Sequence, residues 1–167
     1  MKTLESILKG AELRSTMLSH EGGTKFYEVM TLHVGDKVLC MKRWGRNASK
    51  DKNGTFGKAK DLMPKFYSHY AQAAVNDKMG RGYSVENNFT CTGREMLDKL
   101  ADYGFNDYLI DGDDGEIAAD WFKSLGWDGN KVIGYEEGEL MSDFSEEVDI
   151  PEVVAKQSVA SSVFGSW

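Results

Sequence analysis

The chain has 167 residues, of which 41% are hydrophobic and 11% aromatic, a composition typical of one or two small folded domains. No apolar run approaches the roughly 20 residues that a membrane helix needs, and the first residues lack the apolar core of a signal peptide, so the sequence predicts a cytoplasmic protein without membrane contact. The formal net charge is −7, a value that hides how unevenly the charges are distributed.

Charge divides the chain into a basic and an acidic section. Residues 24–84 hold 12 Lys and Arg against 5 Asp and Glu, whereas residues 85–167 hold 5 against 19. The first 23 residues carry three of each sign. This separation predicts a basic working surface and an acidic section with a different task.

The N-terminal segment, residues 1–23, is predicted to be helical. Apolar side chains recur over residues 1–17 in a loose stripe at helical spacing: Leu4, Ile7, Leu8, Leu13 and Met17. The tetrapeptide Glu21-Gly22-Gly23-Thr24 then breaks the chain.

A β-hairpin is predicted next. Residues 25–34 are rich in aromatic and β-branched side chains, and Gly35-Asp36 is a turn signal before the apolar run 38–41. The second strand is expected to continue to Trp44. Residues 47–57 are rich in Ser, Asn, Asp, Lys and Gly, which indicates an exposed loop that reaches a short strand near Thr55-Phe56.

Three helices are predicted in the rest of the chain. The first covers residues 61–78, with Pro64 in its first turn, and Gly80-Arg81-Gly82-Tyr83 ends it. The second runs from Thr92 to Gly104, because Thr92 and Glu95 have the spacing of a capping box. A third, shorter helix is predicted over residues 117–125. Residues 85–140 are therefore expected to form an acidic, α-rich region, and residues 141–167 a flexible acidic and Ser-rich tail.

The motif Arg43-Trp44-Gly45-Arg46 lies in a stretch, residues 42–60, with seven basic residues and one acidic residue. Arginine presents a planar fork that suits phosphate oxygens, and tryptophan presents a large rigid face. The glycine between them permits close backbone approach. Alternation along a strand predicts Arg43 and Gly45 on one face of the sheet, with Trp44 and Arg46 on the other.

These residues resemble the WGR domain, the DNA-binding module of DNA-damage-responsive poly(ADP-ribose) polymerases that also occurs in stand-alone bacterial and viral proteins. The pattern consists of an opening strand, the signature strand, the entry to the helix and a closing Lys-rich, Gly-aromatic end. These four elements correspond in order to Lys25-Phe26-Tyr27-Glu28, Arg43-Trp44-Gly45-Arg46, Phe56-Gly57, and Lys78 through Gly82-Tyr83. The segment between Lys58 and Tyr83 is a few residues longer than usual for the family, and its Pro64 is unusual there.

The resemblance implies an α+β fold, a twisted antiparallel sheet with a helix packed on it, and non-enzymatic binding of DNA near ends or breaks. It makes Trp44 a candidate platform for a sugar, and Arg43 or Arg46 a candidate phosphate contact. Neighbouring lysines would add attraction that does not depend on base sequence. The predicted nucleic-acid-binding residues are Lys42, Arg43, Trp44, Arg46, Lys50, Lys52, Lys58 and Lys60, and no catalytic residue, cofactor or metal is predicted.

Other interpretations stay open. Trp44 can be a core residue that holds the sheet to the helix, and a Lys-rich loop is often simply solvated. The acidic section can contact a protein partner, or the protein can be an interaction or inhibitor module that mimics nucleic acid and uses the WGR segment only as a scaffold. The tail joins an acidic patch to the terminal Phe164 and Trp167, a composition similar to single-strand-binding proteins whose tails dock onto partners and compete with nucleic acid.

The remaining reactive residue types point to structure rather than chemistry. Cys40 and Cys91 lack a second metal ligand at suitable spacing, so reduced structural thiols are predicted. The acidic turn at residues 111–116 fails as an EF-hand loop, because the alignment places Ile110 and Trp121 at its first and last ligand positions. Its carboxylates could instead hold a hard metal for nuclease chemistry, but a solvated turn is the preferred interpretation.

Overall fold

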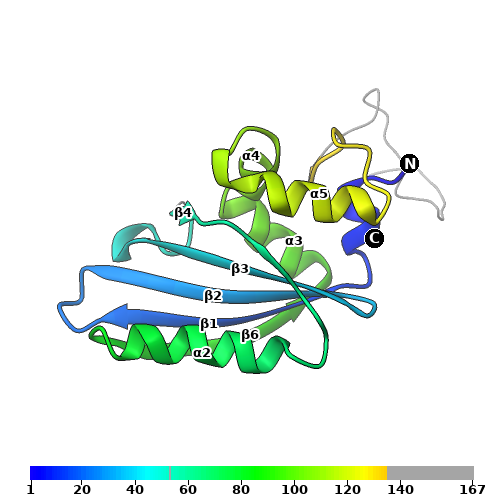
Figure 1. Cartoon of the computed structure of the whole chain (residues 1–167). Coiled ribbons are helices and arrows are strands. Elements are labelled where there is room, and N and C mark those ends of the chain that lie inside the picture. The colour runs from blue at the N-terminus through cyan, green and yellow to red at the C-terminus, as the bar shows by residue number, and fades with distance from the viewer. Residues whose placement is uncertain (53, 135–167) are drawn as a thin grey trace. The chain divides into compact units, whose positions relative to one another are not determined.

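The computed structural model describes residues 1–52 and 54–134. These residues form a mixed α+β fold with an open, antiparallel sheet of six strands (Figure 1). The elements in chain order are α1 (Leu4–Leu8), β1 (Glu12–His20), β2 (Lys25–Val34), β3 (Lys37–Arg46), the 3₁₀ turn η1 (Asn47–Ser49), β4 (Thr55–Phe56), β5 (Lys60–Leu62), α2 (Tyr67–Met79), β6 (Tyr83–Thr92), α3 (Gly93–Asp102), α4 (Phe105–Ile110), the 3₁₀ turn η2 (Asp113–Gly115) and α5 (Glu116–Ser124).

The strand order is β4-β3-β2-β1-β6, and β5 also pairs with β3. The predicted hairpin is confirmed: β2 and β3 pair from Val34 opposite Lys37 to Lys25 opposite Arg46. Gly35 opens the turn with φ of 61°, a left-handed conformation that glycine adopts at no steric cost. The predicted short strand at Thr55–Phe56 is also confirmed, since it pairs with Arg43 and Trp44 of β3.

The prediction of a helix over residues 1–17 is wrong beyond Leu8. The segment Glu12–His20 is strand β1, which pairs with β2 on one side and β6 on the other. Leu13 and Met17 fit either period, because they are four residues apart and therefore also share one face of a strand. Ladders with two neighbouring strands decide between the two periods, so residues 12–20 belong to the sheet and only Leu4–Leu8 is helical.

The predicted boundary at residue 84 falls inside strand β6, which pairs with β1 along its length. Residues 85–92 are therefore strand, and the helices that follow belong to the same compact unit, Met1–Ile133. Helices α3, α4 and α5 lie within the region predicted to be α-rich, and α4 was not predicted as a separate element. Residues 135–140 of that region lie outside the described residues, so the predicted acidic helical region is not confirmed. The prediction of a flexible tail over residues 141–167 lies outside the described residues.

The predicted helix over residues 61–78 begins later, at Tyr67, because Lys60–Leu62 pairs with β3 and Pro64 follows. Residue Thr92 does precede α3, but its side chain makes no capping hydrogen bond, so the predicted capping box is not formed. None of the helices in the described part has both the length and the apolar character needed to cross a lipid bilayer.

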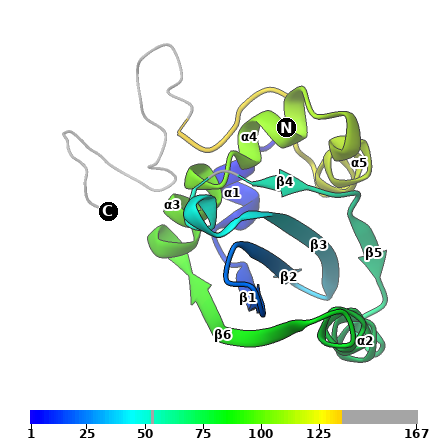
Figure 2. The same ribbon diagram turned by 90° about the vertical axis from the view of Figure 1, so that its left-hand side faces the viewer.

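Helix α2 lies on one side of the sheet and the other helices on the opposite side (Figure 2), and an apolar cluster fills each side. The larger cluster fills what we call the α3 face, where α1, α3, α4 and α5 pack against residues such as Leu13, Met30 and Leu39. The smaller cluster lies on the opposite α2 face, where Val75 of α2 joins Tyr27, Val29 and Cys40. Strand β3 contributes side chains to both.

Candidate functional site

The signature motif divides its side chains between the two faces of β3, as alternation predicted. Arg43 is fully buried on the α3 face. Trp44 lies on the α2 face, where 37% of it is exposed, and Arg46 is exposed at the end of the strand. Adjacent residues of one motif thus have opposite environments.

The prediction that Arg43 contacts phosphate is wrong for this structure, because its guanidinium is enclosed by the protein. Arg43 Nη2 lies 2.8 Å from Glu28 Oε1, and both side chains have 0% exposure. The other carboxylate oxygen of Glu28 accepts hydrogen bonds from Ser15 Oγ at 2.6 Å and from the Tyr103 hydroxyl at 3.2 Å. The ion pair is therefore fully partnered inside the α3 face, which is the condition for burying charge.

Arg43 also holds the loop that follows its own strand. Its guanidinium donates to the main-chain carbonyls of Lys50 and Lys52. The planar group lies between two rings, with Cζ 3.4 Å from the Tyr103 centroid and 4.8 Å from the Phe26 centroid. Arg43 therefore ties the 47–52 loop to the sheet and to the end of α3.

Gly45 faces the same side of the sheet as Arg43 and allows close packing there. A Cβ atom at this position would lie 3.2 Å from Phe26 Cε1 and 3.4 Å from Gly54 Cα. The absence of a side chain at Gly45 therefore lets Phe26 and the backbone at Gly54 pack closely against β3.

Trp44 is partly packed and partly open, so both interpretations of it hold in part. Its ring stacks on Tyr27 with 5.7 Å between centroids and 6° between planes. The edge of the indole packs on Gly57, where a Cβ would lie 2.8 Å from Trp44 Cη2. These contacts fix the ring in one orientation while more than a third of the residue remains accessible.

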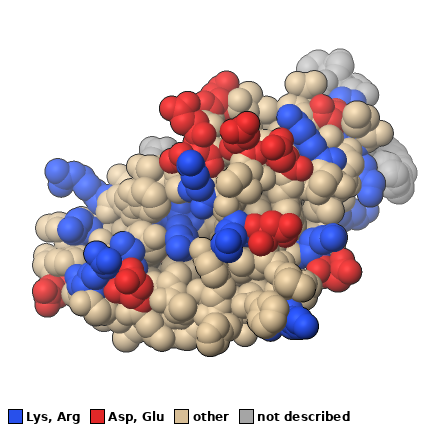
Figure 3. Space-filling model, in the orientation of Figure 1, with Lys and Arg blue, Asp and Glu red and all other residues tan. Residues whose placement is uncertain are grey.

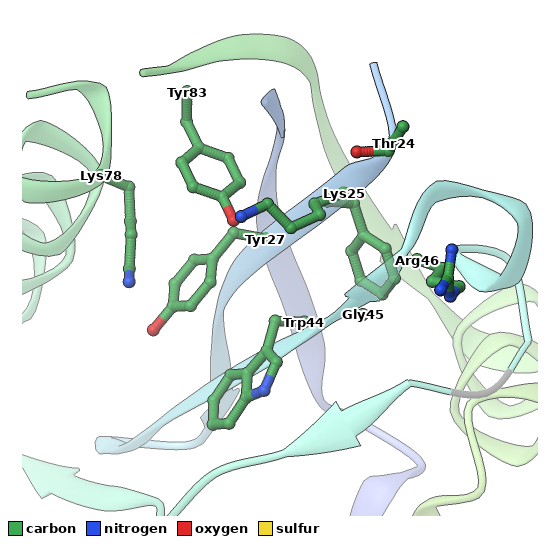
Figure 4. Close-up of a pocket in the computed structure, with 9 residues that line it drawn as sticks. Thr24, Lys25, Tyr27, Trp44, Gly45, Arg46, Lys78 and Tyr83 are labelled. Carbon is green, nitrogen blue, oxygen red and sulfur yellow. The ribbon is translucent and has the colours of Figure 1, made fainter. Parts of the chain in front are cut away.

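A groove of about 590 Å³ opens beside this aromatic pair (Figure 4). Its lining combines four aromatic residues with three cations that come from different elements. The lining residues are Thr24, Lys25, Phe26, Tyr27, Trp44, Gly45, Arg46, Lys78 and Tyr83. Lys25 and Tyr27 belong to β2, Lys78 to α2 and Tyr83 to β6.

The cations of the groove have no carboxylate partner among the described residues. Lys78 Nζ instead lies 4.4 Å from the centroid of the Tyr27 ring. Lys25 and Arg46 form none of the ion pairs found in the described part of the chain. Positive charge that is not neutralised beside exposed rings can attract an anionic ligand with a flat or apolar part.

The other predicted lysines have three kinds of surroundings. Lys42 and Lys60 both lie over the ring of Tyr70 on α2, with Nζ to centroid distances of 5.3 Å and 5.8 Å. Lys50 is paired with Glu86 at 2.9 Å, while Lys52 and Lys58 are exposed. Of the predicted residues, only Trp44 and Arg46 line the groove.

Sequence reasoning missed four groove residues as binding residues: Lys25, Tyr27, Lys78 and Tyr83. The signal for the first two was available in the hairpin register. Counting back from the turn at Gly35 places Tyr27 opposite Trp44 and Lys25 opposite Arg46. Lys78 and Tyr83 reach the groove only through the packing of α2 and β6, which no local pattern reveals.

Acidic side chains gather elsewhere, over α4, η2 and α5 (Figure 3). The exposed members are Asp107, Asp111, Asp113, Glu116 and Asp120. Within residues 1–52 and 54–134, no group of three or more His, Cys, Asp or Glu side chains is arranged to hold a metal ion. The acidic residues thus form a charged surface that faces solvent.

Both cysteines are buried and free of disulfide bonds, in line with the structural thiols predicted. Burial raises the pKa of the Cys40 thiol to about 11. The pKa of the Cys91 thiol is also raised, mainly by burial and to a smaller extent by the negative charge of Glu95. Both groups are thus protonated and poorly nucleophilic near neutral pH.

Comparison with protein-family models, with curated proteins and with solved structures gave no match for this chain.

Proposed function

We propose that this protein is a non-enzymatic, WGR-type DNA-binding protein that grips the sugar-phosphate backbone near a strand end or nick. One observation carries the proposal: Trp44, stacked on the buried Tyr27, is partly exposed in a groove with three cations that have no carboxylate partner among the described residues. The order of signature strand, short strand, helix and closing aromatic supports the same assignment.

The chemistry of the groove suits a sugar flanked by phosphates. Trp44 is held by Tyr27 and Gly57, so its face is available without the entropic cost of ordering a mobile ring. Arg46 offers a fork of N–H donors for phosphate oxygens, and Lys25 and Lys78 supply point charges. None of these groups needs a base edge, so the proposed binding depends little on sequence.

The exposed acidic side chains of α4, η2 and α5 favour a second function, the binding of a protein partner. The α4–η2–α5 surface carries carboxylates that face solvent, and it suits a basic protein partner. In the alternative function, an interaction or inhibitor module, this surface does all the binding and the groove is only part of the scaffold.

Fluorescence anisotropy tests the proposal. The ligands are blunt, nicked and single-stranded DNA of equal length, with and without a 5′-phosphate, across a salt series. The variant Trp44→Ala/Arg46→Ala removes the platform and the fork. As a charge control, Lys9→Gln/Lys37→Gln removes two exposed lysines outside the groove lining, one positive charge more than the Trp44/Arg46 variant loses.

We expect wild type and the control variant to bind, with affinity falling linearly in log salt, and the Trp44/Arg46 variant to lose most binding. A folded Trp44/Arg46 variant that binds as well as wild type would refute the site. Removing the acidic section by truncation after residue 84 would cut strand β6. The interaction-module alternative is therefore tested by neutralising Asp111, Asp113 and Glu116 and measuring capture of a basic protein partner.

A further inference from the structure

We infer that Lys42 and Lys60, which converge on the ring of Tyr70, form a second phosphate subsite that continues the groove along β3. The inference rests on the proposed function and names the part of the ligand involved: two or more phosphates of one extended strand. It adds a site distinct from the residues that line the groove.

The subsite is assembled from three elements. Lys42 lies on β3, Lys60 on β5 and Tyr70 on α2. Both ammonium groups lie within 6 Å of the same ring centroid, at 5.3 Å and 5.8 Å. The attraction between a cation and a ring keeps the two side chains near the surface of α2 rather than extended into solvent.

Electrostatics favours the binding of anions at this pair of lysines. Two like charges gathered over one ring repel each other, and the ring's weak attraction offsets only part of that cost. Among the described residues neither ammonium has a carboxylate or hydrogen-bond partner, in contrast to Lys50, which is paired with Glu86. An extended phosphodiester strand that continues from the groove along β3 would place one phosphate at each ammonium group and neutralise both charges.

The subsite is aligned with Trp44 by the geometry of the strand. Lys42, Trp44 and Arg46 alternate onto the α2 side of β3, so neighbouring members of this row are about 6.7 Å apart at the backbone. That interval is about twice the rise of 3.4 Å per nucleotide along one strand of a stacked duplex. The spacing suits a stacked strand and an extended one alike, so the preference for a single strand rests on the exposed ring of Trp44, because exposed rings are useful mainly to unstacked nucleotides.

The test compares salt dependence in matched variants. Wild type, Lys42→Gln/Lys60→Gln, Trp44→Ala/Arg46→Ala and the control Lys9→Gln/Lys37→Gln are titrated by anisotropy against an oligothymidylate of about 10 nucleotides. A blunt duplex of the same length is titrated in parallel. Salt is varied from about 50 to 200 mM, the range in which counterion release is readily measured. Circular dichroism confirms that each variant is folded.

We expect the Lys42/Lys60 variant to lower the slope of log affinity against log salt by about 1.4 on the single strand, because each lost phosphate contact removes about 0.7. The control pair, with the same loss of charge, should leave the slope unchanged. Wild type should bind the single strand more tightly than the blunt duplex.

Two results would overturn the inference, and they are distinguishable. If the Lys42/Lys60 slope equals that of the control while Trp44→Ala/Arg46→Ala still loses binding, the second subsite is wrong and the proposed function stands. If wild type binds neither ligand at the lowest salt, the subsite and the proposed function are both wrong.

Discussion

Strand β3 carries two arginines three residues apart whose surroundings could hardly differ more. Arg43 on the α3 face has no solvent exposure and is paired with Glu28, whereas Arg46 is exposed beside the Trp44 groove. The α3 face is closed by helices and by the 47–52 loop, and the α2 face is left open at one end. Arg43 thus stabilises the fold, whereas Arg46 is accessible to a ligand.

The difference between the faces shows that a short motif does not assign roles by itself. Arg43 and Arg46 have the same chemistry, and their fates depend on which side of a strand they occupy and on what packs there. The α3 face should therefore respond to mutation through stability, and the α2 groove should respond through binding.

The largest expected effect is on the α3 face. Replacing Glu28 by Gln leaves the buried Arg43 cation without its counter-charge, and we expect a loss of about 3–5 kcal/mol in the free energy of unfolding. Urea denaturation measures it. The double change Glu28→Gln/Arg43→Met removes both charges and should restore part of the loss. A cost below about 1 kcal/mol would indicate that the pair is not enclosed.

The interior of the α2 face should be sensitive to alkaline pH. Burial raises the pKa of Cys40 from 9.0 to about 11, so the unfolded thiol ionises first. Stability from this group is complete below pH 9 and is lost as pH rises toward 11, by up to about 1.4 kcal/mol per pH unit. Urea midpoints between pH 8 and about 10 measure this slope. The variant Cys40→Ala should show a shallower slope, and an identical slope would contradict the assignment.

In the groove, Trp44→Ala should act mainly on binding. Loss of a stacking ring typically costs about 1–3 kcal/mol of affinity, or roughly 5- to 150-fold in Kd. Trp44→Phe keeps a smaller ring and should lose less. Affinity is measured by anisotropy and stability by thermal unfolding of the same samples. A larger change in stability than in binding would reverse the proposed division between the faces.

The smallest effect is expected at Lys50, whose ion pair with Glu86 lies at the surface. Lys50→Gln should change the free energy of unfolding by less than about 1 kcal/mol, because exposed pairs gain little in water. Its DNA affinity should fall no more than that of the Lys9→Gln/Lys37→Gln control. A larger loss of affinity would bring the 47–52 loop into the binding surface.

Local patterns predicted the parts of the fold that local chemistry determines. The β2–β3 hairpin followed from its turn residues, and the short helix predicted over residues 117–125 corresponds to α5. Strand β1 was mistaken for a helix because Leu13 and Met17 satisfy both periods and only pairing with β2 and β6 distinguishes them. Strand β6 was missed because its side chains are largely exposed and polar, and pairing with β1 stabilises it.

The candidate site was predicted in part for a similar reason. Alternation placed Trp44 and Arg46 together, which the structure confirms. Alternation could not show which face is closed. Arg43 is buried partly by Tyr103, which is distant in sequence, and partly by main-chain carbonyls of the loop, which no side-chain pattern reveals. Lys78 needs the packed position of α2 to reach Tyr27.

The way Arg43 holds the 47–52 loop has a consequence for engineering. The anchor points are main-chain oxygens at positions 50 and 52, so the loop is held in place without reference to which amino acids occupy those positions. Side chains at positions 50 and 52 can therefore be varied while the hydrogen bonds from Arg43 keep the backbone of the loop in place. The loop is therefore a natural place to diversify, in a combinatorial library, the contacts made beside the groove.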